Sequence, residues 1–545
     1  MTTSDATELR YGIDRLEMRG RRLFGWGWIA HPAREIATVA LRVAGDGWER
    51  TLPASSGRTR DDVEREFPAL VNAKFSGFVV TGYAERPPVG RLLLEVSYTG
   101  GGGESVDVSG SLERAAPRAR KWQELRWIAG ATWRRLKHGD IAGLVRRARA
   151  QNYTAPSLDD IGIERTLLPK LPPGQSVTII FDHNMGGGAN QYRRNIIEER
   201  TAAGSAILSC TYNLPTLDYR LALHTREAQE ETFRISSFLA LEPLFERVAI
   251  RELFINSPVS FDDPLLFADW AARMRAEHPD MRLTVTAHDY FAVCPSFVLL
   301  NADGHYCGIP DIAECNRCLP RHRASYVTLS PPTAITPWRA SWGRCLGAAD
   351  EVRCFSGSTR ALILRGHPGL DPARVTVVPH RVGFHSPRLP RVRHSDPLTI
   401  GVLGHISEQK GSLIVKRVLS LIEHDLPASR VVVIGTLDLA STSKHLDVTG
   451  PYRRDDLVDL IEARRINMIL FPSICPETFS YVIEEAMLLR MPIVAFDLGA
   501  PGERLRGYDL GRVCGAVDAE AAFKKMREFH DELATRETAN VAPHV

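Results

Sequence analysis

Hydrophobic and polar positions divide the chain into regions with different patterns. Residues 1–112 contain short runs of β-branched and aromatic residues, separated by glycine-rich turns at 44–47 and 99–103. This pattern predicts an all-β sandwich, which would form an accessory domain. Its expected strands lie at 23–29, 38–43, 78–83 and 92–98.

From residue 176 the pattern changes, and apolar strands alternate with helices. The expected strands of a first series are 176–182, 206–210, 253–255, 283–286 and 352–355. After a break at 387–397, those of a second series are 398–403, 431–435, 468–471 and 493–496. Two such series predict an α/β fold with two doubly wound, Rossmann-like domains, which we place at 176–390 and 391–530, followed by a tail at 531–545. Ligands of such sheets bind beyond the carboxyl ends of the strands, here between the domains.

Residues 113–175 are predicted to form a basic, amphipathic helical linker. Apolar residues recur there at helical spacing, and eleven Lys and Arg residues face only two acids between Arg114 and Arg149. That stretch carries +9, although the whole chain carries only +3. Two interpretations stay open: a helix packed on a neighbouring domain, or an interfacial helix on an anionic membrane. Nucleic acid is not an expected partner, because no recognised binding module surrounds the basic stretch.

Composition narrows the protein class and its expected location. Apolar residues make up 44% and charged residues 24% of the chain, which are ordinary globular values. Neither a secretory signal nor a membrane-spanning apolar run is recognisable, and the nine cysteines cannot all pair. We therefore expect a cytoplasmic protein, and the interfacial interpretation of the linker adds peripheral attachment to the inner face of the plasma membrane.

The strongest chemical signal lies at 471–487, where a strand is followed by a loop and a helix expected to begin near Thr478. This places Glu477 at a helix N-terminus, where backbone N–H groups can hold a phosphate. Glu485 follows about 12 Å along the helix, which is roughly the span from the sugar to the ribose of a nucleotide sugar. Carboxylates suit both ends, since they accept hydrogen bonds from hydroxyls. The alternative, an acidic residue in the first turn of any helix, explains Glu477 alone.

This segment resembles the retaining glycosyltransferases of the GT-B fold, family 4. The matching pattern is Pro476-Glu477, seven further residues, then Glu485-Ala486-Met487, and the resemblance covers about 176–530. It implies that Glu477, Thr478 and Phe479 contact the donor sugar and that Glu485 holds the ribose.

The N-terminal region carries a second resemblance. Gly25-Trp26-Gly27-Trp28 and Ser76-Gly77-Phe78 are similar to accessory modules of some bacterial surface-polysaccharide glycosyltransferases. Trp26 and Trp28 share one face of a strand, either as a sugar-stacking platform or as packed aromatics.

Two further segments are expected to bind the donor diphosphate. Lys410 lies between a strand and a helix, where its charge can neutralise a leaving diphosphate. His405 occupies the position where the resemblance implies an arginine, so Lys410 either acts without that partner or is joined by another base such as Arg381. The third segment contains Gly187 and Gly188, which follow the first strand and let the backbone approach the donor phosphates.

His288 follows the strand 283–286. The resemblance implies a histidine beside the reacting sugar at this place, so His288 is the expected reaction-centre residue, with His183 as a weaker candidate. The alternative for His288 is a histidine that only caps the strand end.

A cysteine-rich insertion at 291–320 follows His288. Clustered thiols in a reducing compartment favour a structural Zn²⁺ ion, with His305 and His322 as alternative ligands, although reduced thiols could equally pack the loop. The predicted ligands are Cys294, Cys307, Cys315 and Cys318.

Together these motifs predict a glycosyltransferase that moves a sugar from a nucleotide diphosphate sugar to a growing cell-surface glycan, and the resemblance to family 4 implies retention at the anomeric carbon. The acceptor would be an oligosaccharide, such as a lipid-linked O-antigen or capsule precursor. The chain contains no Asp-x-Asp triplet, so no catalytic metal is expected at the donor site. The alternatives are a nucleotide-sugar epimerase or phosphorylase of the same fold, and a non-catalytic glycan-binding scaffold.

Overall fold

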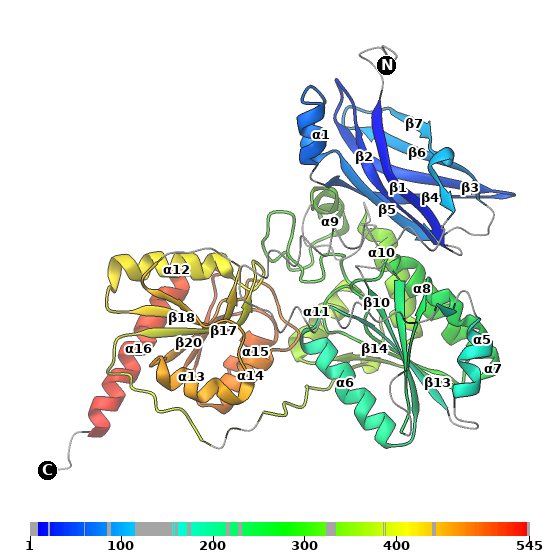
Figure 1. Cartoon of the computed structure of the whole chain (residues 1–545). Helices are drawn as coiled ribbons and strands as arrows, with labels where there is room; N and C mark the ends of the chain where they lie inside the picture. Colours follow the sequence, from blue (N-terminus) through cyan, green and yellow to red (C-terminus); the bar gives the residue numbers. More distant parts are fainter. Residues whose placement is uncertain are drawn as a thin grey trace.

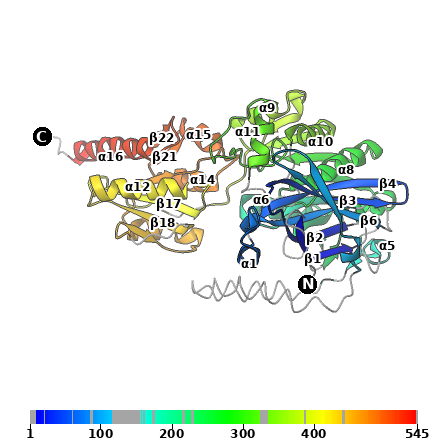
Figure 2. The same cartoon turned by 90° about the horizontal axis from the view of Figure 1, so that it is seen from above.

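In a computed structural model of the chain, three folded bodies follow one another along the sequence (Figure 1). Viewed from above, the C-terminal body lies to one side of the other two (Figure 2). The structure describes residues 9–19, 22–58, 60–83, 89–114, 155, 157–158, 162–171, 176–213, 218–226, 231–322, 334–384, 386, 388–438 and 443–541. Most of the predicted basic linker, from 115 to 154, lies outside these ranges.

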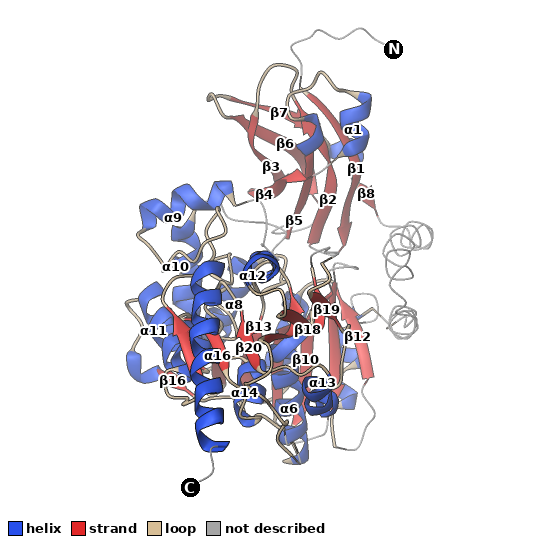
Figure 3. Cartoon of the chain, turned by 90° about the vertical axis from the view of Figure 1, so that its left-hand side faces the viewer, coloured by secondary structure: helices blue, strands red, loops and turns tan. Residues whose placement is uncertain are grey.

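The N-terminal body consists almost entirely of strands (Figure 3). Its strands are β1 (Arg10–Arg19), β2 (Arg22–Ala30), β3 (Ile36–Gly45), β4 (Trp48–Arg58), β5 (Gly77–Tyr83), β6 (Val89–Tyr98), β7 (Gly103–Asp107) and β8 (Glu113–Arg114). Its helices are α1 (Asp61–Glu66), η1 (Ala73–Phe75) and η2 (Ser109–Ser111).

These strands form one continuous sheet in the order β7-β6-β3-β4-β5-β2-β1-β8. The all-β prediction is confirmed. The two halves of the expected sandwich are joined, however, because β4 pairs with both β3 and β5. Alternate residues such as Leu41, Val43 and Leu94 enclose the core, so the strand period of two defines the buried face.

The second body is an α/β domain built on a mixed sheet. Its strands are β9 (Val177–His183), β10 (Ala206–Asn213), β11 (Asp218–His224), β12 (Glu231–Ile235), β13 (Ile250–Ser257), β14 (Arg282–Thr286), β15 (Glu351–Cys354) and β16 (Val375–Val377). Its helices are α5 (Ile163–Thr166), α6 (Gly187–Ala202), α7 (Glu242–Arg247), α8 (Pro264–Glu277), α9 (Ile312–Cys318), α10 (Ile335–Ala348) and α11 (Gly357–Gly366), with short 3-10 helices η3 (Leu168–Lys170), η4 (Phe238–Leu241), η5 (Leu319–Arg321) and η6 (Pro372–Arg374).

The strand order of this sheet is β12-β11-β10-β9-β13-β14-β15-β16, and the edge strands β11 and β12 run antiparallel to their neighbours. Along β9, Ile179 and Phe181 face the large core that α8 and α10 cover, while Ile180 packs with Ile196 of α6 on the other face. Helices on both faces make the sheet doubly wound, and the strand order reverses between β9 and β13.

The third body is an α/β domain with a fully parallel sheet. Its strands are β17 (Thr399–Ile406), β18 (Arg430–Leu437), β19 (Leu446–Val448), β20 (Met468–Phe471), β21 (Ile493–Phe496) and β22 (Gly511–Cys514). Its helices are α12 (Ser412–Asp425), η7 (Arg454–Asp456), α13 (Leu457–Ala463), α14 (Tyr481–Leu488), α15 (Gly499–Leu505) and α16 (Ala519–Val541).

This sheet has the order β19-β18-β17-β20-β21-β22, so its order reverses between β17 and β20. Helices α12 and α16 cover one face and α13 and α14 the other (Figure 1). The predicted pair of doubly wound domains is therefore confirmed. Helix α16 continues through Val541, because Leu533 is buried and Glu537 accepts hydrogen bonds from the backbone N–H groups of His394 and Ser395, so residues 531–541 are helical rather than a tail.

Polar contacts join neighbouring bodies. Arg50 of the β domain forms an ion pair with Asp263, at 2.9 Å, where Asp263 caps α8. The Glu503 carboxylate of α15 accepts hydrogen bonds from the backbone N–H groups of Gly357 and Ser358, which open α11. A carboxylate is favourable at that helix N-terminus, so this contact helps to orient the two α/β domains. Within the described parts of the chain, no helix is both long and apolar enough to cross a bilayer.

Candidate functional site

The candidate site lies where the reversal points of the two α/β sheets face each other. In a doubly wound sheet the loops diverge at this point and leave a crevice at the carboxyl ends of the strands. The loops after β9, β13 and β14 come from one domain, and those after β17 and β20 from the other.

Lys410 and Glu477 form an ion pair, which joins the loops after β17 and β20. Gly411 makes this approach possible: its φ is +86°, and a Cβ atom there would lie 2.0 Å from the carbonyl oxygen of Pro472. Burial lowers the pKa of Lys410, but attraction to Glu477 more than offsets this, so its pKa is raised and it stays charged. The Glu477 side chain is 10% exposed and that of Lys410 is 41% exposed, so the ammonium group borders open space.

The helix after β20 begins later than the sequence predicted. Helix α14 starts at Tyr481, because the Ser480 hydroxyl caps it by accepting a hydrogen bond from the N–H of Ile483. The prediction of a start near Thr478 was therefore wrong, and Glu477 lies in the preceding loop. That loop is held by Ala500, whose N–H donates to the Glu477 carbonyl at 2.8 Å.

Glu485 lies inside α14 and is 2% exposed. Its Oε1 atom is 2.8 Å from Nε of Arg454 in an ion pair, yet no described group donates a hydrogen bond to that oxygen in good geometry. Burial raises the pKa of Glu485, and Arg454 opposes this rise. The guanidinium of Arg454 also lies 5.3 Å above the ring of Tyr481. Glu485 can thus still accept a hydrogen bond at its buried Oε1 atom, which lies beside the partly exposed Arg454.

His288 follows β14 and bridges the two domains. Its carbonyl oxygen accepts a hydrogen bond from the Thr478 hydroxyl at 2.8 Å. Its Nε2 atom is 2.9 Å from Oδ1 of Asn256, whose amide nitrogen donates to the Ala189 carbonyl. That pairing fixes Oδ1 as an acceptor, so Nε2 of His288 carries the proton and Nδ1 is left as an acceptor. Burial, with His380 and His183 nearby, holds the pKa of His288 well below its usual range, so the ring is neutral.

An aromatic cluster surrounds His288. His380 stacks on Phe355 at 4.0 Å between ring centroids, and its Nδ1 atom is 3.1 Å from the Tyr481 hydroxyl. Phe479 lies 4.6 Å from His380, between ring centroids. Residues of both domains therefore pack around His380. Burial lowers the pKa of His380 to about 3. Phe479 belongs to this cluster through its contacts with His380 and Tyr481.

The glycine loop after β9 meets the opposite domain. Gly187 has a φ of +83°, and a Cβ atom on Gly188 would lie 3.0 Å from the ring of Tyr481. The loop is shaped by Asp182, fully buried at the end of β9, which accepts a hydrogen bond from Asn190 and pairs with Arg193 at 2.7 Å.

His183, the weaker reaction-centre candidate, also belongs to the support of this loop. Its Nδ1 atom accepts a hydrogen bond from the N–H of Met185, and its carbonyl accepts one from Asn190. Burial lowers the pKa of His183 to about 4, so this ring is neutral as well.

His405 does not join Lys410. Its Nδ1 atom is 2.7 Å from the Thr436 hydroxyl and its Nε2 atom is 3.3 Å from a carboxylate oxygen of Asp438. The His405 side chain is 63% exposed, so the ring lies at the surface with partners of its own.

Comparison with known sequences identifies the C-terminal domain. Residues 397–532 match the sequence model of the family described as Glycosyl transferases group 1. Over this range the third body is similar to the group 1 glycosyl transferases. The matched range contains the loops of Lys410 and Glu477 as well as Glu485.

Solved structures show weaker similarity. The chain is similar to sucrose-phosphate synthase from Thermosynechococcus elongatus, with 15% identity, a TM-score of 0.45, and coverage of 66% of this chain and 92% of that one. Anabaena HepE in complex with UDP-glucose gives 13% identity, a TM-score of 0.44 and coverage of 66% and 90%. The lipopolysaccharide outer core galactosyltransferase WaaB in its apo form gives 12%, 0.42, and 66% and 94%.

These similarities are too weak to support an inference about activity, so the fold assignment rests on the strand order described above. No curated protein matches the sequence.

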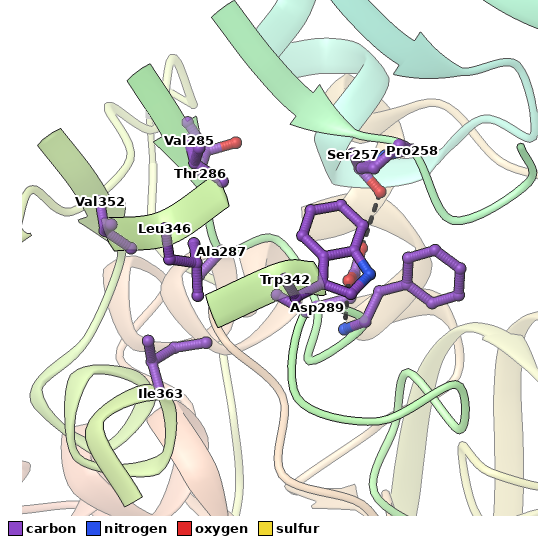
Figure 4. Close-up of a pocket in the computed structure, with 12 residues that line it drawn as sticks. Ser257, Pro258, Val285, Thr286, Ala287, Asp289, Trp342, Leu346, Val352 and Ile363 are labelled. Atoms are coloured by element: carbon purple, nitrogen blue, oxygen red, sulfur yellow. Dashed lines mark hydrogen bonds between the residues drawn. The ribbon is translucent and has the colours of Figure 1, made fainter. Parts of the chain in front are cut away.

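A small pocket is lined by Ala287 and Asp289, the two neighbours of His288 in the sequence (Figure 4). Asp289 lines this pocket and accepts hydrogen bonds from the Ser257 hydroxyl at 2.7 Å and from the N–H of Phe291 at 2.8 Å. Burial raises the pKa of Asp289. The other lining residues are mostly apolar, such as Trp342 and Ile363, and all of them belong to the second body, so the pocket lies in the scaffold of that domain.

The four predicted zinc ligands lie in one region beside this loop. Burial raises the pKa of Cys294 to about 12, and the neighbouring thiols of Cys307, Cys315 and Cys318 contribute to the rise. Nearby groups already contact two of the sulfur atoms: Arg339 lies 3.6 Å from the sulfur of Cys315, and the N–H of Ala302 lies 3.3 Å from that of Cys318.

All nine cysteines are among the described residues, and each is a free thiol. Thiolates are the ligands that Zn²⁺ prefers, so the chemistry of the four side chains fits the ion. As placed, however, no three His, Cys, Asp or Glu residues in the described ranges are close enough to hold a metal. The zinc site therefore stays a prediction.

Several site residues were missed by the sequence analysis. Asp182 and Asn256 end buried strands at the reversal point of the sheet, and a search of strand ends for polar residues could have found them. Arg454 had no such signal, because it follows the short strand β19 in a run of charged residues.

Proposed function

We propose that the chain transfers a sugar from a nucleotide diphosphate sugar to a growing cell-surface glycan, with retention at the anomeric carbon. The observation that carries this proposal is the Lys410–Glu477 ion pair in the third body, placed where the two reversal points meet beside His288. The bond that breaks joins the anomeric carbon of the sugar to a phosphate oxygen. A cation suits the phosphate side of this bond, and a carboxylate suits the hydroxyls on the sugar side.

Lys410 would stabilise the charge that develops on the leaving diphosphate as the bond between the anomeric carbon and the phosphate oxygen breaks. The acceptor hydroxyl then bonds to the anomeric carbon and gives its proton to the departing phosphate oxygen on the same face. Glu477 would accept hydrogen bonds from donor-sugar hydroxyls. This sequence of bond changes requires no covalent carboxylate intermediate.

Two further groups support the same ligand. Nδ1 of the neutral His288 can accept a hydrogen bond from a sugar hydroxyl. Oε1 of Glu485, buried and without a good hydrogen-bond donor among the described residues, suits a ribose hydroxyl. A hydrogen bond to a buried acceptor is more favourable than one to an exposed acceptor, because a buried acceptor without a hydrogen bond costs about 1–3 kcal/mol.

The acceptor and the cellular location are proposed from the sequence resemblance. A lipid-linked glycan would lie at the inner face of the plasma membrane, and the basic stretch 114–149 would bring the enzyme there. We also propose that the donor site needs no metal, since the chain lacks an Asp-x-Asp triplet, and that the cysteine cluster holds a structural zinc. Transfer that persists in a chelator would support the claim that the donor site needs no metal. The rate is compared per folded protein, because loss of the structural zinc could unfold part of the sample.

The test is hydrolysis and transfer from a panel of nucleotide sugars. Glu477→Gln keeps the shape and removes the charge, so we expect turnover to fall at least ~100-fold. Lys410→Ala should weaken binding of the nucleoside diphosphate product severalfold.

Glu520→Gln is the matched control, because Glu520 lies in the same domain and forms an exposed ion pair with Arg417 instead of with Lys410. Full turnover by Glu477→Gln at saturating donor would overturn the assignment. Activity without any acceptor, giving an epimerised donor, would instead favour an epimerase.

A further inference from the structure

The donor site proposed above is short of positive charge. A diphosphate carries at least two negative charges, while Lys410 is paired with Glu477 and Glu485 adds a further carboxylate. His405 occupies the position where a second cation is expected, but its ring nitrogens contact Thr436 and Asp438. Another cation must therefore face the crevice if a diphosphate binds there.

Arg454 is the cation that the structure places in this crevice. It opens η7, directly after the turn that follows β19, and its side chain is 44% exposed. Its guanidinium lies over Tyr481, and the ring of Tyr481 reaches the glycine loop at Gly188. One face of Tyr481 thus carries a cation while its edge touches the backbone loop expected to border phosphates.

The contact of Arg454 with Glu485 uses the Nε edge of the guanidinium. A guanidinium has five N–H donors in a planar fork, so the Nη groups can still bind two phosphate oxygens. The Glu485 contact holds the fork at a fixed height above Tyr481. It also keeps the side chain close to the carboxylate that would bind the ribose, next to the diphosphate in any nucleoside diphosphate.

We propose that Arg454 binds the diphosphate of the donor and supplies the second cation that His405 does not provide. This inference rests on the proposed function, because it assigns a residue to the same donor site. When ribose hydroxyls donate to Glu485, the guanidinium keeps its place over Tyr481 and turns its Nη groups to the phosphates. The competing explanation is that Arg454 only neutralises the buried Glu485.

The two explanations differ in how the loss of affinity depends on phosphate. The experiment measures, by calorimetry, the affinity of the wild-type chain for a nucleoside and its mono- and diphosphate, with the base chosen by a first screen. Arg454→Gln should weaken diphosphate binding about 10- to 100-fold, as expected for a charge-assisted hydrogen bond, and leave nucleoside binding within about twofold. Arg454→Lys should restore part of the diphosphate affinity, since it keeps the charge without the fork.

Arg453→Gln is the matched control, because Arg453 is adjacent, 81% exposed and paired only loosely with Asp455 at 3.6 Å. Arg381→Gln tests the basic residue next to His380 that the sequence analysis named as an alternative partner of Lys410. Equal weakening of nucleoside and diphosphate by Arg454→Gln would overturn the proposal in favour of a counter-ion to Glu485. Unchanged diphosphate binding, or a loss that follows Arg381→Gln instead, would also overturn it.

If the wild-type chain binds no nucleoside diphosphate, the proposed function itself fails and this inference fails with it. Thermal unfolding of each variant separates loss of the ligand contact from loss of the fold. If Arg454→Gln melts well below the wild type, Arg454→Lys is measured in its place, and an equal fold-loss of affinity for nucleoside and diphosphate in Arg454→Lys would then refute the role.

Discussion

Gly499 should control transfer without contacting the donor. It opens α15 with a φ of +55°, and a Cβ atom there would lie 2.5 Å from the carbonyl oxygen of Glu477 and 2.7 Å from its nitrogen. Ordinary contact begins at 3.4 Å, so Gly499→Ala requires the Glu477 backbone to move by 3.4 − 2.5, which is about 0.9 Å. A left-handed alanine costs a further ~1–2 kcal/mol.

A shift of this size separates Glu477 from its ion-pair partner Lys410. Displacements near 1 Å in a site that aligns reacting groups cost about 100-fold in rate, and functional groups must be held within about 0.5 Å. We therefore expect kcat/KM of Gly499→Ala to fall ~100-fold in the nucleotide-sugar transfer assay, with only a modest fall in Tm.

Gly507→Ala is the control, since it lies just after α15, is exposed, and its Cβ atom would meet nothing closer than 3.8 Å. That variant should transfer at the wild-type rate. Folded Gly499→Ala protein with near-normal kcat/KM would refute the reasoning that the 476–479 loop must stay at its present place.

Three other predictions follow from the remaining features. Protein purified without chelators should contain about one zinc, and Cys315→Ser should lose it and lower the Tm; metal analysis that finds none rules the site out. Residues 114–149 should bind anionic vesicles at low salt and release them at high salt, with a blue shift in tryptophan emission; no co-sedimentation at low salt removes the membrane claim. Burial lowers the pKa of His380 to about 3, so its neutral form stabilises the fold fully above pH 6.5, and this contribution is lost as pH falls towards 3. As the pH falls from 6.5 to 4, the free energy of unfolding of His380→Gln should therefore decrease by about 1.4 kcal/mol less per pH unit than that of the wild type. Identical pH dependences of the free energy of unfolding would contradict this.

The sequence determined the elements and their classes. Apolar runs such as 398–403 and 431–435 became central strands because a parallel strand buried on both faces reads as a continuous apolar segment. The Pro-Glu segment after β20 and the lysine after β17 could be found for the same reason: each follows such a strand directly, and the carboxyl ends of parallel strands share one edge of the sheet. Periodicity also gave the all-β character of residues 1–112.

The tertiary structure alone decided which charges meet. Lys410 pairs with Glu477, while His405 turns to Asp438, because of where the segments after β17, β18 and β20 lie, and no spacing along the chain encodes that. The start of α14 at Tyr481 rather than near Thr478 was decided by the Ser480 cap and by Gly499 under the loop.

Contacts across the domains were equally hidden from the sequence. The hydrogen bond from Thr478 to the carbonyl of His288 joins two domains and residues 190 positions apart. Within the third body, the place of Arg454 over Tyr481 likewise brings together η7 and α14, which are distant in the sequence. Hydrophobic periodicity is a local property of the chain, so it fixes which face of an element is buried. The partners of a polar side chain at a strand end depend instead on how whole sheets pack, which is a property of the folded molecule.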